Sequence, residues 1–192
     1  PQSLPQYQSS PKKVVVGHGI DLTYWPKRSN QAMDAKRLLL VHRLSRSKRV
    51  ELLFQALTHL PGYSLDIYGI EAEKDYVAEL KALVQRLGLN DRVQWKGSAP
   101  IKDLPAIYSA HRLILNLASE TIDKTMLEAM TCGCYPVTTK GNALAIGIPL
   151  APDETPQSIA AFIREHSEKA PLSADDMFDI VQTRHSLEEL IA

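Results

Sequence analysis

Short apolar runs alternate along the chain with longer segments in which apolar residues recur at helical spacing. Val50, Leu53, Phe54 and Leu57, for example, follow the i, i+3, i+4, i+7 pattern of a buried helical face. This alternation is typical of strand-helix units that build a mainly parallel sheet. We predict strands at Lys13–Val16, Arg37–His42, Ser64–Tyr68, Arg92–Lys96, Leu113–Leu117 and Tyr135–Thr139, and helices near 48–59, 73–87, 102–110, 124–132, 156–167 and 174–191.

The order of these elements predicts an α/β fold, a Rossmann-like parallel sheet flanked by helices on both faces. A chain of 192 residues is enough for one well-packed core and short for two, so we expect a single domain over residues 13–192. Residues 1–12 are rich in Pro, Ser and Gln and have neither the basic start nor the apolar centre of a secretion signal. We expect them to be a linker or an edge segment.

The composition narrows the classes of partner. Lysine plus arginine balance aspartate plus glutamate at 22 each, so bulk charge gives no reason to expect a nucleic acid or an acidic membrane surface. Any anion site must be local. No apolar run approaches the length that spans a bilayer. Cys132 and Cys134 have no second pair to complete a zinc site, so we expect buried reduced thiols, which favour a reducing compartment and hence the cytoplasm.

The stretch Gly17-His18-Gly19 admits two interpretations. One is the glycine fingerprint of a dinucleotide site, but Leu22 stands where the third glycine belongs and no strong helical pattern follows. The better interpretation is a turn that leaves the first predicted strand, with Tyr24-Trp25-Pro26 packed beneath it as an anchor.

The segment from Glu120 to Glu128 says most about function. Asp123 suits a helix N-cap and Gly133 suits the end of the same helix, which places Glu120 on the preceding loop and Glu128 one turn inside. Both carboxylates can then border one crevice at the carboxyl end of a strand, where open α/β sheets bind ligands. The free N–H groups of a helix start favour an anion there. A hydroxyl-rich ligand that carries phosphate fits both features.

Four blocks of sequence together resemble the C-terminal, donor-binding half of GT-B glycosyltransferases, specifically the large family 4 (group 1) with its many retaining hexosyltransferases. The similarity runs from about Val14 to Leu150. The blocks that carry it are His18-Gly19-Ile20-Asp21, Leu40 to Lys48, Leu87 to Gly97, and Glu120 to Glu128.

The resemblance implies that Arg43 and Lys48 bind the diphosphate of the donor. Their positions at or just beyond the end of a predicted strand agree, because an arginine fork and a lysine point charge suit a pyrophosphate. The alternative is a solvated basic patch, since Arg46, Lys48 and Arg49 crowd the same loop.

The resemblance also implies roles for the two carboxylates. Glu128 matches the glutamate that accepts hydrogen bonds from the nucleotide ribose, and Glu120 matches the one that contacts hydroxyls of the transferred sugar. Carboxylates suit vicinal diols because each accepts two hydrogen bonds. The alternative for Glu120 is compensation of charge at a helix N-terminus. Gly97 and Ser98 match a loop that faces the base.

The sequence departs from the family pattern around the proposed phosphates. Between its glutamates the family has a small, glycine-bearing stretch, whereas this chain has Asp123, Lys124 and Thr125. Asp123 would repel a phosphate unless its carboxylate caps the helix, and Lys124 either adds a third cation or points into water. Family glycines on both sides of the basic pair are replaced by His42 and Arg49, which leaves the path of that loop open.

As the resemblance implies, the reaction is transfer of a hexosyl group from a UDP-, GDP- or ADP-sugar to a glycan, lipid or small-molecule acceptor, with retention. Arg43, Lys48, Glu120 and the helix start would act without a cofactor or a metal. The acceptor site belongs to an N-terminal domain that this chain lacks, so we expect weak donor binding and no turnover. The family leaves peripheral membrane association open. Two rival functions are a sugar-nucleotide epimerase of the same fold and a non-catalytic interaction module.

Overall fold

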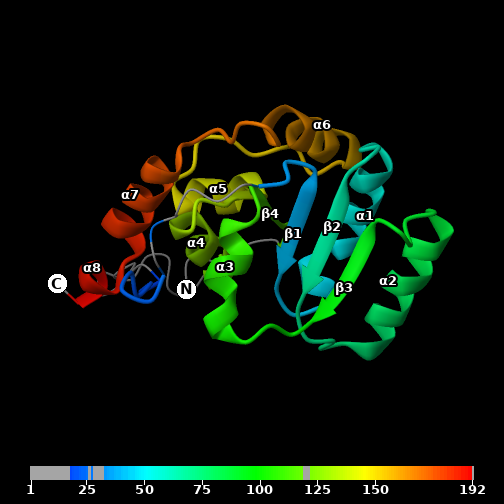
Figure 1. Cartoon of the computed structure of the whole chain (residues 1–192), viewed down its shortest axis with the longest axis horizontal. Coiled ribbons are helices and arrows are strands. Elements are labelled where there is room, and N and C mark those ends of the chain that lie inside the picture. The colour runs from blue at the N-terminus through cyan, green and yellow to red at the C-terminus, as the bar shows by residue number, and fades with distance from the viewer. Residues whose placement is uncertain (1–17, 26, 28–32, 119–121, 192) are drawn as a thin grey trace, which may run out of the picture.

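The fold is a five-stranded sheet in the order β3-β2-β1-β4-β5, with every pair of neighbouring strands parallel. Figure 1 shows it in a computed structural model, which describes residues 18–25, 27, 33–118 and 122–191. The run that we predicted at 13–16 lies outside the described residues. The other predicted strands are confirmed to within one residue at each end: β1 (Arg37–Val41), β2 (Ser64–Tyr68), β3 (Val93–Gly97), β4 (Leu113–Asn116) and β5 (Tyr135–Thr138).

Helices cover the sheet from both sides, which confirms the predicted α/β class (Figure 1). The crossovers from β1 to β3 run through α1 (Val50–Thr58) and α2 (Lys74–Arg86), while those from β3 to β5 run through α3 (Leu104–Ser109) and α4 (Lys124–Thr131). Because both sets of crossovers are right-handed and the chain moves across the sheet in opposite directions, the two sets lie on opposite faces. The strand order therefore reverses between β1 and β4.

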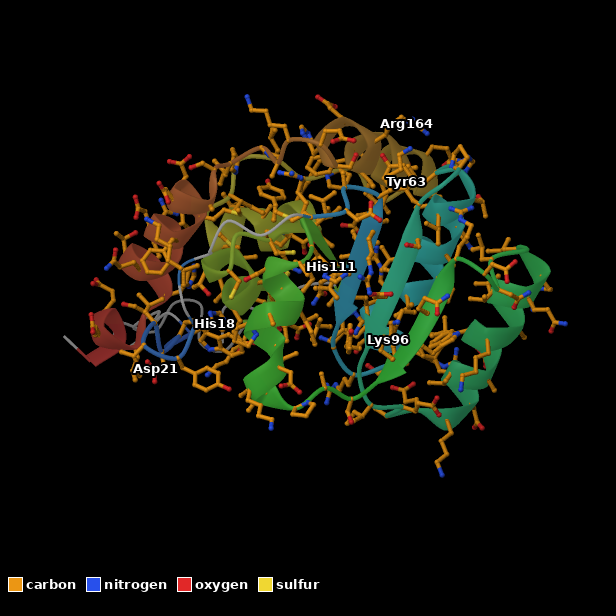
Figure 2. All side chains as sticks on the ribbon, viewed as in Figure 1. His18, Asp21, Tyr63, Lys96, His111 and Arg164 are labelled. Atoms are coloured by element: carbon orange, nitrogen blue, oxygen red, sulfur yellow. The ribbon has the colours of Figure 1, made fainter. Side chains whose placement is uncertain are left out.

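The core lies around the central strands. Leu38 to Val41 of β1 and all four residues of β4 are buried, as expected for strands covered on both faces. Phe54 of α1 and Tyr108 of α3 are completely buried on the two sides of the sheet. Outside the strands, α6 (Pro156–His166) packs on α1, where Tyr63 bonds to Ser167 and Arg164 donates to a backbone carbonyl (Figure 2).

The prediction of one helix over 174–191 is wrong. α7 (Ala174–His185) ends before Ser186, which is extended at φ −68° and ψ 158°, and α8 (Leu187–Ile191) follows. Ser186 leaves the helical conformation because it forms a parallel bridge with Ile20, near the beginning of the described chain. α7 itself packs against α4. The C-terminal segment therefore ties the turn around Ile20 to the helix that carries Lys124.

The helix α5 (Lys140–Ile146) was not predicted. Gly141 lies in the first turn of this helix. The Thr139 hydroxyl accepts a hydrogen bond from the Asn142 N–H as N-cap, and Gly147 closes the helix at φ 96°. These capping residues were the available signal.

Two smaller predictions are confirmed. Trp25 is buried and its ring lies 5.9 Å from that of Tyr108, so it anchors the turn as expected, whereas Tyr24 is exposed and residue 26 lies outside the described residues. Cys132 and Cys134 are buried thiols rather than a disulfide. Burial raises the pKa of the Cys132 thiol to about 11, which keeps it protonated and unreactive.

Candidate functional site

A cavity of about 350 Å³ opens at the carboxyl edge of the sheet, where the strand order reverses between β1 and β4. Reversal of the order leaves a gap between the two diverging crossovers, which is why open α/β sheets bind ligands at this place. β1 contributes the residues just after its end, β4 contributes Ala118, and α4 contributes its first turn. The described residues that line the cavity are His42, Arg43, Ser47, Lys48, Ala118, Asp123, Lys124 and Thr125.

Two cations of the cavity form no ion pair with any described residue. Arg43 is exposed just beyond β1, and Lys124 is exposed at the start of α4. Their charged neighbours behave differently, because Arg46 forms a bidentate pair with Glu79, and Arg49 pairs with Glu154 at 2.6 Å. The crowded basic loop is therefore not a uniform solvated patch. Its paired cations are held away from the cavity, and Arg43 is left for a ligand.

Lys48 is held by a buried ion pair. Its Nζ donates to both carboxylate oxygens of Asp123, at 2.7 and 2.6 Å, and its side chain is only 6% exposed. Asn116, the last residue of β4, donates to Asp123 Oδ2 at 2.6 Å and accepts a hydrogen bond from the Ala118 N–H. Lys48, Asp123 and Asn116 thus join the loop after β1 to the entrance of α4.

Asp123 occupies the N-cap position that we predicted, but its carboxylate does not cap the helix. Its backbone is extended, at φ −81° and ψ 135°, and no side-chain capping hydrogen bond forms. Its oxygens accept instead from Lys48, which adds the attraction of a full positive charge, and from Asn116. The Met126 N–H already donates to the Asp123 carbonyl, so the N–H groups of Lys124 and Thr125 are the ones in the first turn of α4 that remain available to an anion.

His42 places a neutral ring in the wall of the cavity. Its Nδ1 lies 3.0 Å from the Arg43 carbonyl, which can only accept, so Nδ1 carries the proton. Burial lowers the pKa of His42 to about 4, so the ring is neutral near pH 7 and Nε2 presents a lone pair. This Nε2 has no described hydrogen-bond partner, and neither has the buried hydroxyl of Thr125 in the same cavity. Both atoms are themselves shielded from solvent, so they belong to the wall of the cavity rather than to its open surface.

The path of the loop after β1 is set by two backbone features. Arg49 adopts the left-handed conformation, at φ 52° and ψ 42°, which suits the glycine that the family has at this position. Gly69, after β2, lies against the end of β1, since a Cβ atom added to it would be 1.9 Å from the His42 carbonyl oxygen. The loop thus follows a glycine-like path at Arg49, and a glycine next to His42 keeps the two strand ends close.

Glu128 lies one turn beyond Lys124 on α4 but does not line the cavity. The Tyr108 hydroxyl donates to its Oε2 at 3.4 Å, a long hydrogen bond. Burial raises the pKa of Glu128, and the charge of Lys124 opposes this shift. Burial lowers the pKa of His18, and the charges of His185 and then of Lys124 add to this shift. Glu128, Lys124 and His18 therefore share one neighbourhood next to the cavity.

The other predicted residues are not brought to the cavity. Gly97 ends β3 and Ser98 follows it, two strands away from β1 in the sheet and roughly 10 Å along it. Glu120 lies outside the described residues. The structure thus places Arg43, Lys48, Asp123, Lys124 and Thr125 around one cavity, Glu128 beside it, and Gly97 and Ser98 further along the same edge.

Sequence reasoning missed the residues that fix the cavity wall. Asn116 was included only as part of a strand, although a polar residue at the end of an apolar run was the signal. Asn142 of α5 donates to the Ala118 carbonyl at 2.7 Å and is buried. Tyr108 and Gly69 carried no local signal, since their partners are distant in sequence.

No three or more His, Cys, Asp or Glu side chains of the described residues are grouped so that they could hold a metal ion. Within the same residues, no helix combines the length and the apolar character that a membrane crossing needs.

The chain is similar to known glycosyltransferases. The family model described as "Glycosyl transferases group 1" matches residues 23–146. Among curated proteins, the GtfA subunit of UDP-N-acetylglucosamine–peptide N-acetylglucosaminyltransferase from Streptococcus gordonii is 32% identical over 125 residues. That match covers 62% of this chain and 23% of the relative, so the chain spans about a quarter of that relative's length.

Solved structures have the same fold. HepE from Anabaena, in complex with UDP-glucose, superimposes with a TM-score of 0.74 at 25% identity, over 90% of this chain and 53% of that one. The C-terminal domain of a glycosyl transferase group 1 family protein (LpcC) from Francisella tularensis superimposes with a TM-score of 0.71 at 19% identity. The match covers 88% of this chain and 100% of that domain. The second likeness shows the fold alone.

Proposed function

This chain belongs to the glycosyl transferases group 1 family, and on that basis we propose that its cavity binds the diphosphate of a nucleoside diphosphate sugar. The chain would serve as the donor-binding half of an enzyme that transfers a hexosyl group. The single observation that carries this proposal is the cavity at the strand-order reversal, where Arg43 and Lys124, which pair with none of the described residues, lie beside the start of α4.

Each cation has a distinct proposed role at the diphosphate. Arg43 forms a bidentate fork with phosphate oxygens, and Lys124 supplies a point charge at the opposite wall. Lys48 contributes less directly. Its ammonium has three N–H donors, and Asp123 engages two of them, which leaves one for a phosphate oxygen. The uncapped first turn of α4 adds backbone N–H groups.

The donor is proposed to extend from this cavity in both directions. Glu128 would accept hydrogen bonds from the ribose, which its position one turn beyond Lys124 supports. Glu120 would contact the transferred sugar, and Gly97 and Ser98 would lie near the base, further along the carboxyl edge. A UDP-sugar is one candidate donor, because HepE was solved with UDP-glucose, and GDP- and ADP-sugars are the others.

The chemistry that these groups favour is departure of the nucleoside diphosphate. Negative charge grows on the leaving phosphate in the transition state, and preorganised cations and N–H donors stabilise it most where water is scarce. Arg43, Lys124 and Lys48 would do this without a divalent metal. We propose retention of the anomeric configuration, with the acceptor site on an N-terminal domain beyond this chain.

Calorimetry of the 192-residue chain with UDP, GDP, ADP and UDP-glucose tests the binding. We expect at least one ligand to bind, and Arg43→Ala to weaken that binding tenfold or more, since a charged hydrogen bond contributes about 1.5–3 kcal/mol. Arg86→Ala is the matched control, because Arg86 ends α2 at the opposite edge of the sheet. No heat with any ligand at millimolar concentration would contradict the proposal.

A non-catalytic interaction module is the second candidate function. The Lys48–Asp123 pair favours it, because Asp123 neutralises a positive charge that would otherwise attract a diphosphate. The two functions differ in their response to Arg43→Ala. A donor site loses nucleotide affinity, whereas an interaction module binds no nucleotide and keeps its partner. In either case we expect the isolated chain not to turn over a sugar nucleotide.

A further inference from the structure

The cavity contains one carboxylate among its described residues, and its position is unusual for a site that binds a diphosphate. Asp123 lies beside Lys48, in the wall shared with Lys124. Lys48 and Asn116 hold its two oxygens, and its side chain is 20% exposed. A fixed negative charge here weakens the binding of any anion, so its effect depends on how much charge the anion carries.

The described residues of the cavity leave two net positive charges, because Arg43, Lys48 and Lys124 are opposed by Asp123 alone. His42 adds none, since burial keeps its ring neutral near pH 7. The diphosphate of a nucleoside diphosphate sugar has about two negative charges, because the sugar esterifies the terminal phosphate. A free nucleoside diphosphate has about three above pH 7, since its terminal phosphate loses a second proton near pH 6.

We propose that Asp123 is a specificity-determining residue that shifts the preference of the cavity from the free nucleoside diphosphate toward the intact nucleotide sugar. This inference rests on the proposed function. Repulsion by Asp123 acts on every charge of the ligand and therefore falls hardest on the trianionic product. A cavity without this carboxylate would bind the product more tightly and release it more slowly.

The test compares the dissociation constants of UDP and UDP-glucose, by calorimetry at pH 8 and low salt, for the 192-residue chain and Asp123→Asn. Asparagine keeps the size of the side chain and one oxygen that can accept from Lys48, but it removes the charge. We expect the affinity for UDP to rise about tenfold more than that for UDP-glucose. Asp153→Asn, which removes an exposed carboxylate paired with Lys140, should leave the ratio unchanged.

A second variant tests the sign of the effect. Lys124→Met removes a positive charge from an exposed side chain, so folding is not at risk. This variant should weaken the binding of UDP more than the binding of UDP-glucose. The ratio of the two dissociation constants then moves in opposite directions in the two variants. Binding of both ligands with an unchanged ratio, or shifts in the same direction, overturns the inference and leaves the proposed function standing. Failure of both ligands to bind the unmodified chain overturns both.

Discussion

The carboxylates of Asp66 and Asp123 both pair with a lysine or arginine side chain, and only one of them marks a candidate ligand site. Asp66 lies in the middle of β2 with a side chain 2% exposed. Arg37 contacts it at 2.5 Å, His111 at 3.5 Å and Lys96 at 3.9 Å, and Figure 2 shows the last two over the strands of the sheet. Asp123 has Lys48 and Asn116 as partners at the carboxyl edge.

The difference lies in what surrounds each ion pair. Burial raises the pKa of Asp66, but the neighbouring His111, Arg37 and Lys96 outweigh burial and hold that pKa below its usual range. Its cations converge on the carboxylate itself. Asp123 instead lines a cavity of about 350 Å³ whose other cations have no described partner. An ion pair at a shielded carboxylate therefore does not by itself indicate a binding site, because both regions have one. A binding site is indicated by cations that line a cavity and have no described partner.

The largest effect that separates the two regions is expected from Asp66→Ala. Removal of this carboxylate takes the counter-charge from Arg37, Lys96 and the buried His111. Because the side chains of Arg37 and Lys96 are 42% and 34% exposed, water screens part of the effect, and we expect a loss of about 3 kcal/mol, the low end for a broken buried pair. Denaturant unfolding measures this loss. Nucleotide affinity of the folded protein should stay within twofold.

The control for this variant is Asp153→Ala, which breaks an exposed pair with Lys140 and should change stability by less than about 1 kcal/mol. If Asp66→Ala left stability unchanged but abolished nucleotide binding, the two regions would have been assigned the wrong way round.

The second prediction concerns the acid stability of the cavity wall. The folded-state pKa of His42 is about 4, against 6.5 for the free side chain, so between these values the unfolded chain binds the proton that the folded chain excludes. Stability is therefore complete above pH 6.5 and falls as the pH drops toward 4. The loss amounts to about 3 kcal/mol. Unfolding in urea at a series of pH values measures it.

His42→Gln should flatten this part of the pH profile, because glutamine does not titrate. The exposed His59→Gln serves as control and should retain the slope. An unchanged slope in His42→Gln would show that His42 does not cause the acid loss, and His18 and His185, whose pKa values burial also lowers, would be the next candidates.

A smaller effect, about 2 kcal/mol, is expected from Gly69→Ala. The added Cβ would lie 1.9 Å from the carbonyl oxygen of His42, and relief of that overlap must move the backbone that carries Arg43. We expect lower stability and weaker nucleotide binding in the same variant. Gly141→Ala is the matched control, because its Cβ meets no atom within 4 Å and alanine favours the helix. Equal behaviour of both variants would contradict the role of the close approach.

The strands and most of the helices were predictable because their signals are local. Each apolar run and helical stripe is contained in one segment, and the cavity cations Arg43 and Lys124 follow directly from positions next to predicted elements. The break at Ser186 was not predictable in this way. It exists because Ser186 pairs with Ile20, a partner more than a hundred and sixty positions earlier.

The same limit applies to the site. The sequence placed Asp123 at a helix N-cap, and that position is confirmed, but it did not reveal that the carboxylate prefers Lys48, 75 positions away. The local sequence was compatible with a carboxylate that caps the helix and with one that pairs elsewhere. Only the tertiary contact with Lys48 selects between the two. The requirement for glycine at position 69 was hidden from the sequence for the same reason. It arises because the end of another strand, at His42, leaves no room for a Cβ atom.

The smallest effect tests how far the ligand region extends along α4. Glu128 lies beyond the cavity, and its described hydrogen bond, from Tyr108, is 3.4 Å long, so its carboxylate retains acceptor capacity. If Glu128 binds a ribose hydroxyl, Glu128→Gln should raise the dissociation constant of UDP about fivefold, which corresponds to about 1 kcal/mol of binding free energy. Glu79→Gln, which changes an exposed carboxylate paired with Arg46, should have no effect. Affinities of both variants within a factor of two of the unmodified chain would confine the ligand to the cavity and make Glu128 a structural partner of Tyr108.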